Sequence, residues 1–151
     1  MRVTGLAAAV CAVLVISLGQ YPDHLRAQGD PAVLADEFYA RLQSASVIQR
    51  DFFLDTQLNR ILVGRGRVIA VDTIGRYKRR YRISLAGLAA SPKITFYVYA
   101  DGDDYHALLA AGDLFEFKGQ FVVYTPVNSR RDAYIFDIVM EEGAVVVEEA
   151  R

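Results

Sequence analysis

Positively charged residues gather in one stretch of the chain, from Arg60 to Arg82. This stretch holds eight basic residues and a single acid, Asp72, so its net charge is +7, although the whole chain carries −1. The basic residues are Arg60, Arg65, Arg67, Arg76, Lys78, Arg79, Arg80 and Arg82. Guanidinium and ammonium groups bind phosphates and carboxylates, and arginine also stacks on aromatic rings. The chemistry that this stretch favours is the binding of an anionic ligand.

The rest of residues 20–151 carries eight basic and 17 acidic residues, a net charge of −9. The near-neutral total therefore hides an uneven distribution of charge along the chain. A generally basic nucleic-acid-binding protein is excluded as a description of the whole chain. The basic residues matter for binding only if the fold brings them to one surface.

Alternating hydrophobicity predicts three consecutive strands, at about 62–70, 77–85 and 94–99. Neighbouring strands of this kind would bring the basic residues to one surface. Successive side chains of a strand point to opposite faces, so the apolar residues would face the core and the residues between them would face outward. The expected ligand-binding residues are Arg65, Arg67, Lys78, Arg80, Arg82, Tyr97 and Tyr99. Arginine and tyrosine are also common on solvated strands, where basic residues resist aggregation, so a surface without a ligand is the alternative.

No set of catalytic or metal-binding residues stands out. The two histidines, His24 and His106, have too few further ligands at metal-binding spacing, and we expect both at the surface. Asp101, Asp103 and Asp104 resemble part of a calcium loop but are not followed by its downstream ligands, which favours a turn with helix-capping aspartates. Motifs for a nucleophile, a zinc protease or a phosphate loop are missing. We therefore expect no enzymatic activity, no cofactor and no metal.

The N-terminus has the pattern of an export signal. Arg2 precedes an apolar run of 13 residues, 6–18, which suits a signal-peptide core and is shorter than the ~20 residues that span a bilayer. Ser17 and Gly19 are small and favour cleavage after Gly19. Cleavage after Ala27 and retention as an uncleaved membrane anchor are the alternatives.

The single cysteine, Cys11, lies inside this apolar run. It follows Val10, where a lipidation motif needs a small residue, so lipidation is not expected. One cysteine excludes an intramolecular disulfide scaffold. We expect a periplasmic or secreted protein that folds without disulfides.

Four segments are predicted: a signal peptide at 1–19, a linker at 20–30, an N-terminal helix at 31–50 and a β-rich domain at 51–151. Asp30 and Pro31 are typical of a helix N-cap and first helical position. Residues 51–62 are ambiguous, because they either continue the helix after a break or form an irregular lead into the first strand. The helix either closes one end of the domain or stands apart from it.

The β-rich domain is expected to contain five main strands. The three strands above are followed by a short helix at 104–110, a fourth strand at about 115–123 and a fifth at 134–140. Residues 144–149 are a candidate for a short sixth strand at the edge.

Two segments resemble OB-fold domains. In Leu108–Gly119, leucines precede a Gly112-Asp113 turn, an alternating strand and a glycine, which resembles the helix end and fourth strand of these domains. Gly64–Val68 resembles their glycine-marked first strand. The resemblance covers about residues 60–142. This segment is similar to small secreted bacterial OB-fold proteins and to tRNA-anticodon-like OB families. The resemblance implies an all-β fold with accessory helices: a five-stranded Greek-key OB-type barrel preceded by an N-terminal α-helix.

The sequence therefore predicts an exported, non-enzymatic OB-fold-like module that binds an anionic ligand or partner on a basic, aromatic face. The alternative is a structural or protein-interaction component of the cell envelope without such a ligand. Nucleic acid fits the fold analogy but is disfavoured by export, and membrane contact is expected only through an uncleaved N-terminal segment.

Overall fold

The computed structural model of the 151-residue chain describes residues 33–141. The predicted signal peptide, the linker, the helix start at Asp30 and Pro31, and the strand at 144–149 lie outside the described residues.

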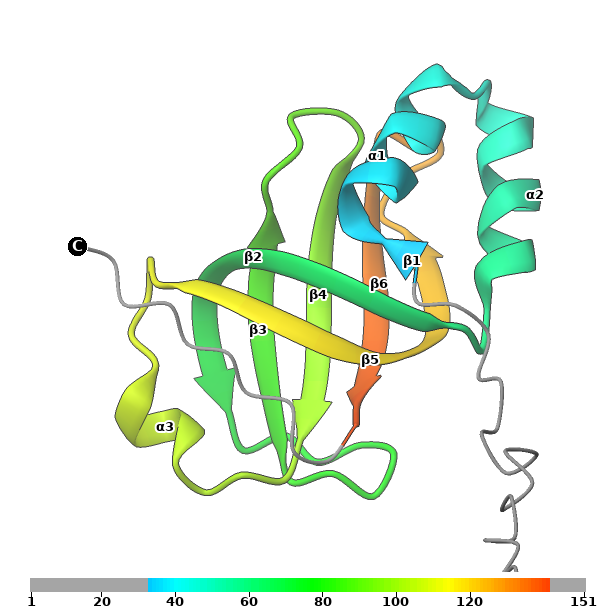
Figure 1. The fold of residues 1–151 in the computed structure, drawn as a ribbon. Coiled ribbons are helices and arrows are strands. Elements are labelled where there is room, and N and C mark those ends of the chain that lie inside the picture. The colour runs from blue at the N-terminus through cyan, green and yellow to red at the C-terminus, as the bar shows by residue number, and fades with distance from the viewer. Residues whose placement is uncertain (1–32, 142–151) are drawn as a thin grey trace, which may run out of the picture.

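Five strands form one mixed sheet that closes into a ring (Figure 1). Around the ring the order is β2-β3-β4-β6-β5, and β5 pairs with β2 to complete it. The β4–β6 pair is parallel and the other four pairs are antiparallel. The strands are β2 (Ile61–Asp72), β3 (Tyr81–Gly87), β4 (Lys93–Ala100), β5 (Leu114–Pro126) and β6 (Ala133–Met140). The prediction of a mostly β fold with five main strands and preceding helical structure is confirmed.

Strand β2 takes part in two pairings and so joins the two ends of the sheet. Its first half pairs with β5 and its second half with β3. A Cβ atom at Gly64 would lie 2.5 Å from the ring of Phe117, and one at Gly66 would lie 2.7 Å from the Ala86 carbonyl oxygen. The register shifts between Val68 and Ala70, two residues after Gly66, which is typical of a β-bulge.

Two helices, not one, precede the closed sheet: α1 (Ala35–Ser44) and α2 (Val47–Gln57). The predicted helix at 31–50 is wrong at both ends. The short strand β1 (Val33–Leu34) pairs with β2 in parallel, so α1 begins only at Ala35. The Ser46 amide donates to the Gln49 side chain at 3.0 Å where α2 starts. Residues 51–57 are helical, as one of the two interpretations of 51–62 had it, but the break lies at Ala45 and Ser46, inside the predicted helix.

Helix α1 packs against one end of the ring (Figure 1). Leu42 is fully buried, and the ring of Phe38 lies 6.1 Å from that of Phe121 on β5 and 5.7 Å from that of Phe136 on β6. Of the two arrangements expected for the helix, the structure has the one that closes an end of the domain. Within residues 33–141, no helix combines the length and the apolar character needed to cross a membrane.

The short helix between the third and fourth main strands is present as α3 (Tyr105–Leu108). Tyr105 is buried, and its ring meets Phe115 of β5 edge to face at 6.1 Å. Figure 1 shows α3 at the end of the ring opposite α1. Both ends of the closed sheet therefore carry aromatic residues that join its core.

The predicted second strand at 77–85 begins only at Tyr81. Tyr77 and Lys78 have φ values of 55° and 61°, in the left-handed region that no strand residue adopts. Arg76 and Arg79 exchange backbone hydrogen bonds of 2.9–3.0 Å around them, which makes these two residues the centre of a tight turn. Side-chain alternation did not reveal this turn, because turns of this kind usually contain glycine or asparagine.

The contribution of α1 to the core can be tested with Leu42→Ala. Deleting a fully buried leucine side chain should lower the free energy of unfolding by about 2–5 kcal/mol. The matched control is Ile48→Ala on α2, whose side chain is 84% exposed, and it should change the stability by less than about 0.5 kcal/mol. Urea unfolding followed by circular dichroism measures both, and similar values for the two variants would show that α1 does not support the core.

Candidate functional site

The structure divides the seven predicted ligand-binding residues among three places. Arg65 and Arg67 are exposed on β2. Lys78 and Arg80 lie in the loop between β2 and β3, not on a strand. The other three, Arg82, Tyr97 and Tyr99, lie on the neighbouring strands β3 and β4.

Most of the basic residues between Arg60 and Arg82 are neutralised by aspartates. Within residues 33–141, five of the eight form ion pairs. The pairs are Arg65–Asp36, Arg76–Asp137, Arg79–Asp101, Arg80–Asp103 and Arg82–Asp72. Four of these aspartates come from outside the basic stretch. The sequence therefore overstated the positive charge of this surface, because the fold brings acids from distant segments to the arginines.

Arg82 and Tyr97 are in contact across the β3–β4 strand pair. The Arg82 guanidinium carbon lies 4.5 Å from the centre of the Tyr97 ring, in the geometry of a cation–π contact. Asp72 holds the guanidinium from the β2 side with an ion pair of 2.9 Å. Tyr97 stands opposite Ser84 on β3, so Arg82 reaches it diagonally across the strand pair. We call this pair the Arg82–Tyr97 platform.

Tyr99 was expected to be exposed, and this expectation is wrong. Its side chain is on the outward face of β4, yet only 2% of the residue is accessible. The ring of Tyr77 packs against it edge to face, with the centres 5.1 Å apart. The turn between β2 and β3 thus folds back over this part of the sheet and removes Tyr99 from the surface.

The buried carboxylate of Asp137 on β6 holds the turn in place. Its Oδ2 accepts a hydrogen bond from the Tyr77 hydroxyl and another from Arg76 Nη1, both of 2.8 Å. Asp137 is 4% exposed, so these two bonds replace the water that a carboxylate needs. Asp137 is the single acid inside the apolar segment 134–140, which is the sequence signal for this role.

The aspartates after β4 anchor the same loop from the other side. Asp101 accepts hydrogen bonds from Arg79 Nη1 at 2.8 Å and from the Arg80 amide at 3.0 Å. The bond from Arg79, followed by that from Arg80, lowers the pKa of Asp101. Asp103 accepts from the Tyr81 hydroxyl at 2.9 Å. These aspartates were expected to cap a helix, but Asp104 at the start of α3 makes no such side-chain bond.

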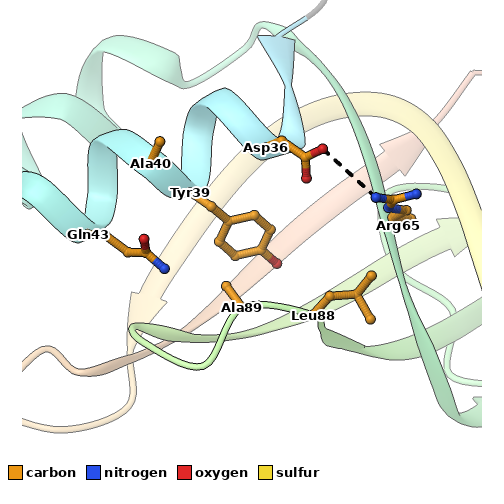
Figure 2. A pocket seen from close by; sticks show the side chains of 7 residues that line it. All are labelled: Asp36, Tyr39, Ala40, Gln43, Arg65, Leu88 and Ala89. Atoms are coloured by element: carbon orange, nitrogen blue, oxygen red, sulfur yellow. Dashed lines mark ion pairs between the residues drawn. The ribbon is translucent and has the colours of Figure 1, made fainter.

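A pocket of about 260 Å³ lies between α1, β2 and the loop that follows β3 (Figure 2). We call it the α1 pocket. Its lining residues are Asp36, Tyr39, Ala40 and Gln43 of α1, Arg65 of β2, and Leu88 and Ala89 of the loop. Asp36 and Arg65 face each other across its mouth, 3.9 Å apart. Tyr39 reaches into it from α1 (Figure 2).

The hydroxyl of Tyr39 is buried and has no hydrogen-bond partner within the described part of the chain. Burial raises the pKa of this phenol, and the nearby Asp36 adds to the effect. The hydroxyl lies so close to Gly87 that a Cβ atom there would collide with it. Tyr39, Asp36 and Gln43 carry no signal in the sequence, since only the position of α1 over the sheet places them beside Arg65.

Residues 33–141 contain no group of three or more histidine, cysteine or acidic residues that would hold a metal ion. His106 is exposed and packs its ring against Tyr81, with the centres 5.8 Å apart.

Comparison with known proteins adds little to this geometry. No protein-family model and no curated protein matches the chain. Among solved structures, the chain is similar to an aspartyl-tRNA synthetase from Leishmania major Friedlin, with 14% sequence identity and a TM-score of 0.37. The match covers 84% of this chain and 22% of that chain.

The bond between Tyr77 and Asp137 can be tested through the alkaline limit of stability. Burial, followed by the hydrogen bond to Asp137, raises the pKa of Tyr77 to about 12, while an unfolded tyrosine titrates near 10. The stability that this bond contributes is therefore fully present below pH 10 and is lost as the pH rises from about 10 to about 12.

Tyr77→Phe should lower the free energy of unfolding by about 1 kcal/mol at pH 8 and should lose less stability than the parent between pH 8 and pH 11. Urea unfolding at several pH values measures both effects. In a double-mutant cycle with Asp137→Asn, the two changes should not be additive. Additive effects, or equal losses at pH 11 in the variant and the parent, would contradict the bond.

Proposed function

We propose that this chain is an exported, non-enzymatic binding module with an OB-type barrel, which holds an anionic ligand or partner on the outer face of β3 and β4. The Arg82–Tyr97 platform is the observation that carries this proposal. It offers a cation and a ring in contact on adjacent strands.

The strand pairing supports the OB-type assignment. The order β2-β3-β4-β6-β5 with closure of β5 onto β2, together with a short helix between β4 and β5, matches a five-stranded Greek-key barrel in which that helix follows the third strand. The parallel β4–β6 pair fits the same topology. In such barrels, the outer face of the second and third strands is the usual ligand surface, and here those strands are β3 and β4.

The contacts of the platform narrow the class of ligand. Arg82 is held at 2.9 Å by Asp72, so its guanidinium plane has a fixed orientation before any ligand arrives. A planar cation stacked on a ring suits an anionic group carried next to a flat or cyclic one, such as an acidic sugar or a nucleotide. Lys78 is exposed in the neighbouring turn and forms no ion pair within residues 33–141, so it adds a second positive charge.

The ion pairs also set how strongly salt should weaken binding. Each guanidinium that already pairs with an aspartate releases few counterions when it meets an anion. Binding should therefore depend on salt less steeply than the sequence charge of +7 suggests. Export makes a glycan, a lipid headgroup or an acidic protein a more natural ligand than nucleic acid.

The alternative function, a protein-interaction component of the envelope, rests on a different surface. On α2, Ile48 is 84% and Phe52 is 72% exposed, and Val47 beside them is 41% exposed. Large apolar side chains that cluster in this way favour contact with another protein. The two functions predict that different substitutions impair binding. For the ligand module they lie on β3 and β4, and for the interaction protein they lie on α2.

The experiment measures binding of the full chain to heparin, to a dT15 oligonucleotide and to phosphatidylglycerol vesicles by fluorescence anisotropy or sedimentation. Arg82→Gln should weaken binding to the preferred probe about tenfold, because a charge-assisted contact is lost. Arg82→Lys keeps the charge but loses the planar stack, so it should fall between Arg82→Gln and the parent.

The matched control is Arg41→Gln, which removes the same charge from the exposed surface of α1 and should leave binding within about twofold. Thermal unfolding checks that each variant remains folded. Equal binding by Arg82→Gln and the parent, or no binding of any probe at low salt, would refute the proposed ligand face. Loss of a partner after Ile48→Ser and Phe52→Ser would favour the alternative.

A further inference from the structure

The α1 pocket offers a second place for a ligand, separate from the Arg82–Tyr97 platform. Its polar groups come from two elements that the sequence does not place together, α1 and β2 (Figure 2). Tyr39 is 9% exposed, and its hydroxyl lacks a partner among the described residues. A buried hydroxyl with no protein partner costs free energy unless a water molecule or a ligand binds it.

The two charged residues at the mouth are available to a ligand. The Asp36 and Arg65 side chains are 85% and 47% exposed, and their nearest oxygen and nitrogen atoms are 3.9 Å apart. An exposed pair at this distance contributes little to stability, so a ligand that replaces it loses little. Arg65 can bind a carboxylate through two parallel hydrogen bonds, and Asp36 can accept bonds from an ammonium group.

The combination of charges decides the class of ligand. A simple anion would be attracted by Arg65 but repelled by Asp36. A simple cation would be attracted by Asp36 but repelled by Arg65. A neutral ligand would leave both charges partly desolvated without compensation. A molecule with both an ammonium and a carboxylate group satisfies both side chains at once.

The rest of the pocket fits a small molecule of this kind. Its volume of about 260 Å³ is slightly below that of typical small-molecule sites, which begin at about 300 Å³, so only a very small ligand fits. Ala40, Ala89 and the half-exposed Leu88 provide an apolar wall, and Gln43 adds an amide at the rim. The Tyr39 hydroxyl is buried, so a ligand carboxylate beside Arg65 would reach it only if the half-exposed Leu88 side chain moved.

We propose that the α1 pocket binds a small zwitterion, in particular a free α-amino acid with an apolar side chain. In this arrangement Arg65 and the Tyr39 hydroxyl hold the carboxylate, Asp36 holds the ammonium group, and the side chain lies on Ala40, Leu88 and Ala89. This inference goes beyond the proposed function and does not depend on it, because the pocket shares no residue with the Arg82–Tyr97 platform.

The test titrates the ¹⁵N-labelled full chain with four probes and follows amide chemical shifts in NMR spectra. The probes are L-leucine, 4-methylpentanoate, which lacks its amino group, 3-methylbutylamine, which lacks its carboxylate, and glucose. L-leucine should shift the amides of Gly87, Leu88 and Ala89 in a saturable manner. The other three probes should bind at least about tenfold more weakly, since each loses a charge-assisted contact.

Four variants identify the side chains that bind leucine. Tyr39→Phe should weaken leucine binding about tenfold while its melting temperature stays equal or rises, because the hydroxyl has no partner without the ligand. Arg65→Gln should abolish saturable binding. Arg67→Gln, on the same face of β2 but outside the pocket, and Arg82→Gln should leave it unchanged.

Several results would overturn the zwitterion site. Equal affinity for 4-methylpentanoate would make it a simple anion site, and preferred binding of glucose would make it a sugar site. A lower melting temperature of Tyr39→Phe would show that the hydroxyl has a structural partner. If no probe shifts these amides, the Tyr39 hydroxyl interacts with water alone. If Arg82→Gln binds heparin as well as the parent, the proposed ligand face is refuted, but the results of the leucine titration are not affected. The two proposals can therefore be refuted separately.

Discussion

The double pairing of β2 is the constraint on which the rest of the structure depends. One strand forms hydrogen bonds with β5 along its first half and with β3 along its second, and this turns an open sheet into a ring. The chain must bend strongly where the partners change, and Phe117 and the backbone of Ala86 come too close there for any side chain. Gly64 and Gly66 make the bend possible, and the register shift after Val68 completes it.

Closing the sheet leaves two open ends that must be covered, since the interior is filled with aromatic rings. Phe38 and Leu42 of α1 enter the core at one end, and Tyr105 of α3 joins it at the other. The α1 pocket is a consequence of this arrangement. A helix that covers a ring of strands cannot match its rim everywhere, and the hollow forms where α1 meets β2 and the loop after β3.

The loop between β2 and β3 shows how tertiary contacts offset local strain. Tyr77 and Lys78 both adopt left-handed backbone angles, which cost roughly 1–2 kcal/mol for each non-glycine residue. The turn persists because its side chains bind elsewhere, Tyr77 and Arg76 to Asp137 and Arg79 to Asp101. These bonds use the arginines that otherwise would have formed a continuous basic surface, so the stability of the loop limits the charge available to a ligand.

The sequence by itself determined the features that depend on near neighbours in the chain. Alternation along 62–70 and 94–98 predicted which residues of β2 and β4 face the core, because side-chain direction in a strand follows from the backbone alone. Apolar spacing indicated helical structure before the strands. The turn at Tyr77 and Lys78 was not predicted, since local preference does not favour left-handed angles at these residues. The break at Ser46 was not predicted at its place either, although Ser46 and Gln49 have the spacing of a capping box.

Only the tertiary structure decided what each charged and aromatic residue meets. Alternation along a strand predicts that Tyr99 points away from the core, but it does not predict that Tyr77 covers the Tyr99 ring. The same alternation predicts that Arg65 and Arg82 both face outward. It does not predict that Arg65 pairs with Asp36 of a helix, or that Arg82 contacts Tyr97 of a neighbouring strand. Electrostatic and ring contacts act through space over a few ångströms, so they are settled by which distant segments the closed sheet brings together.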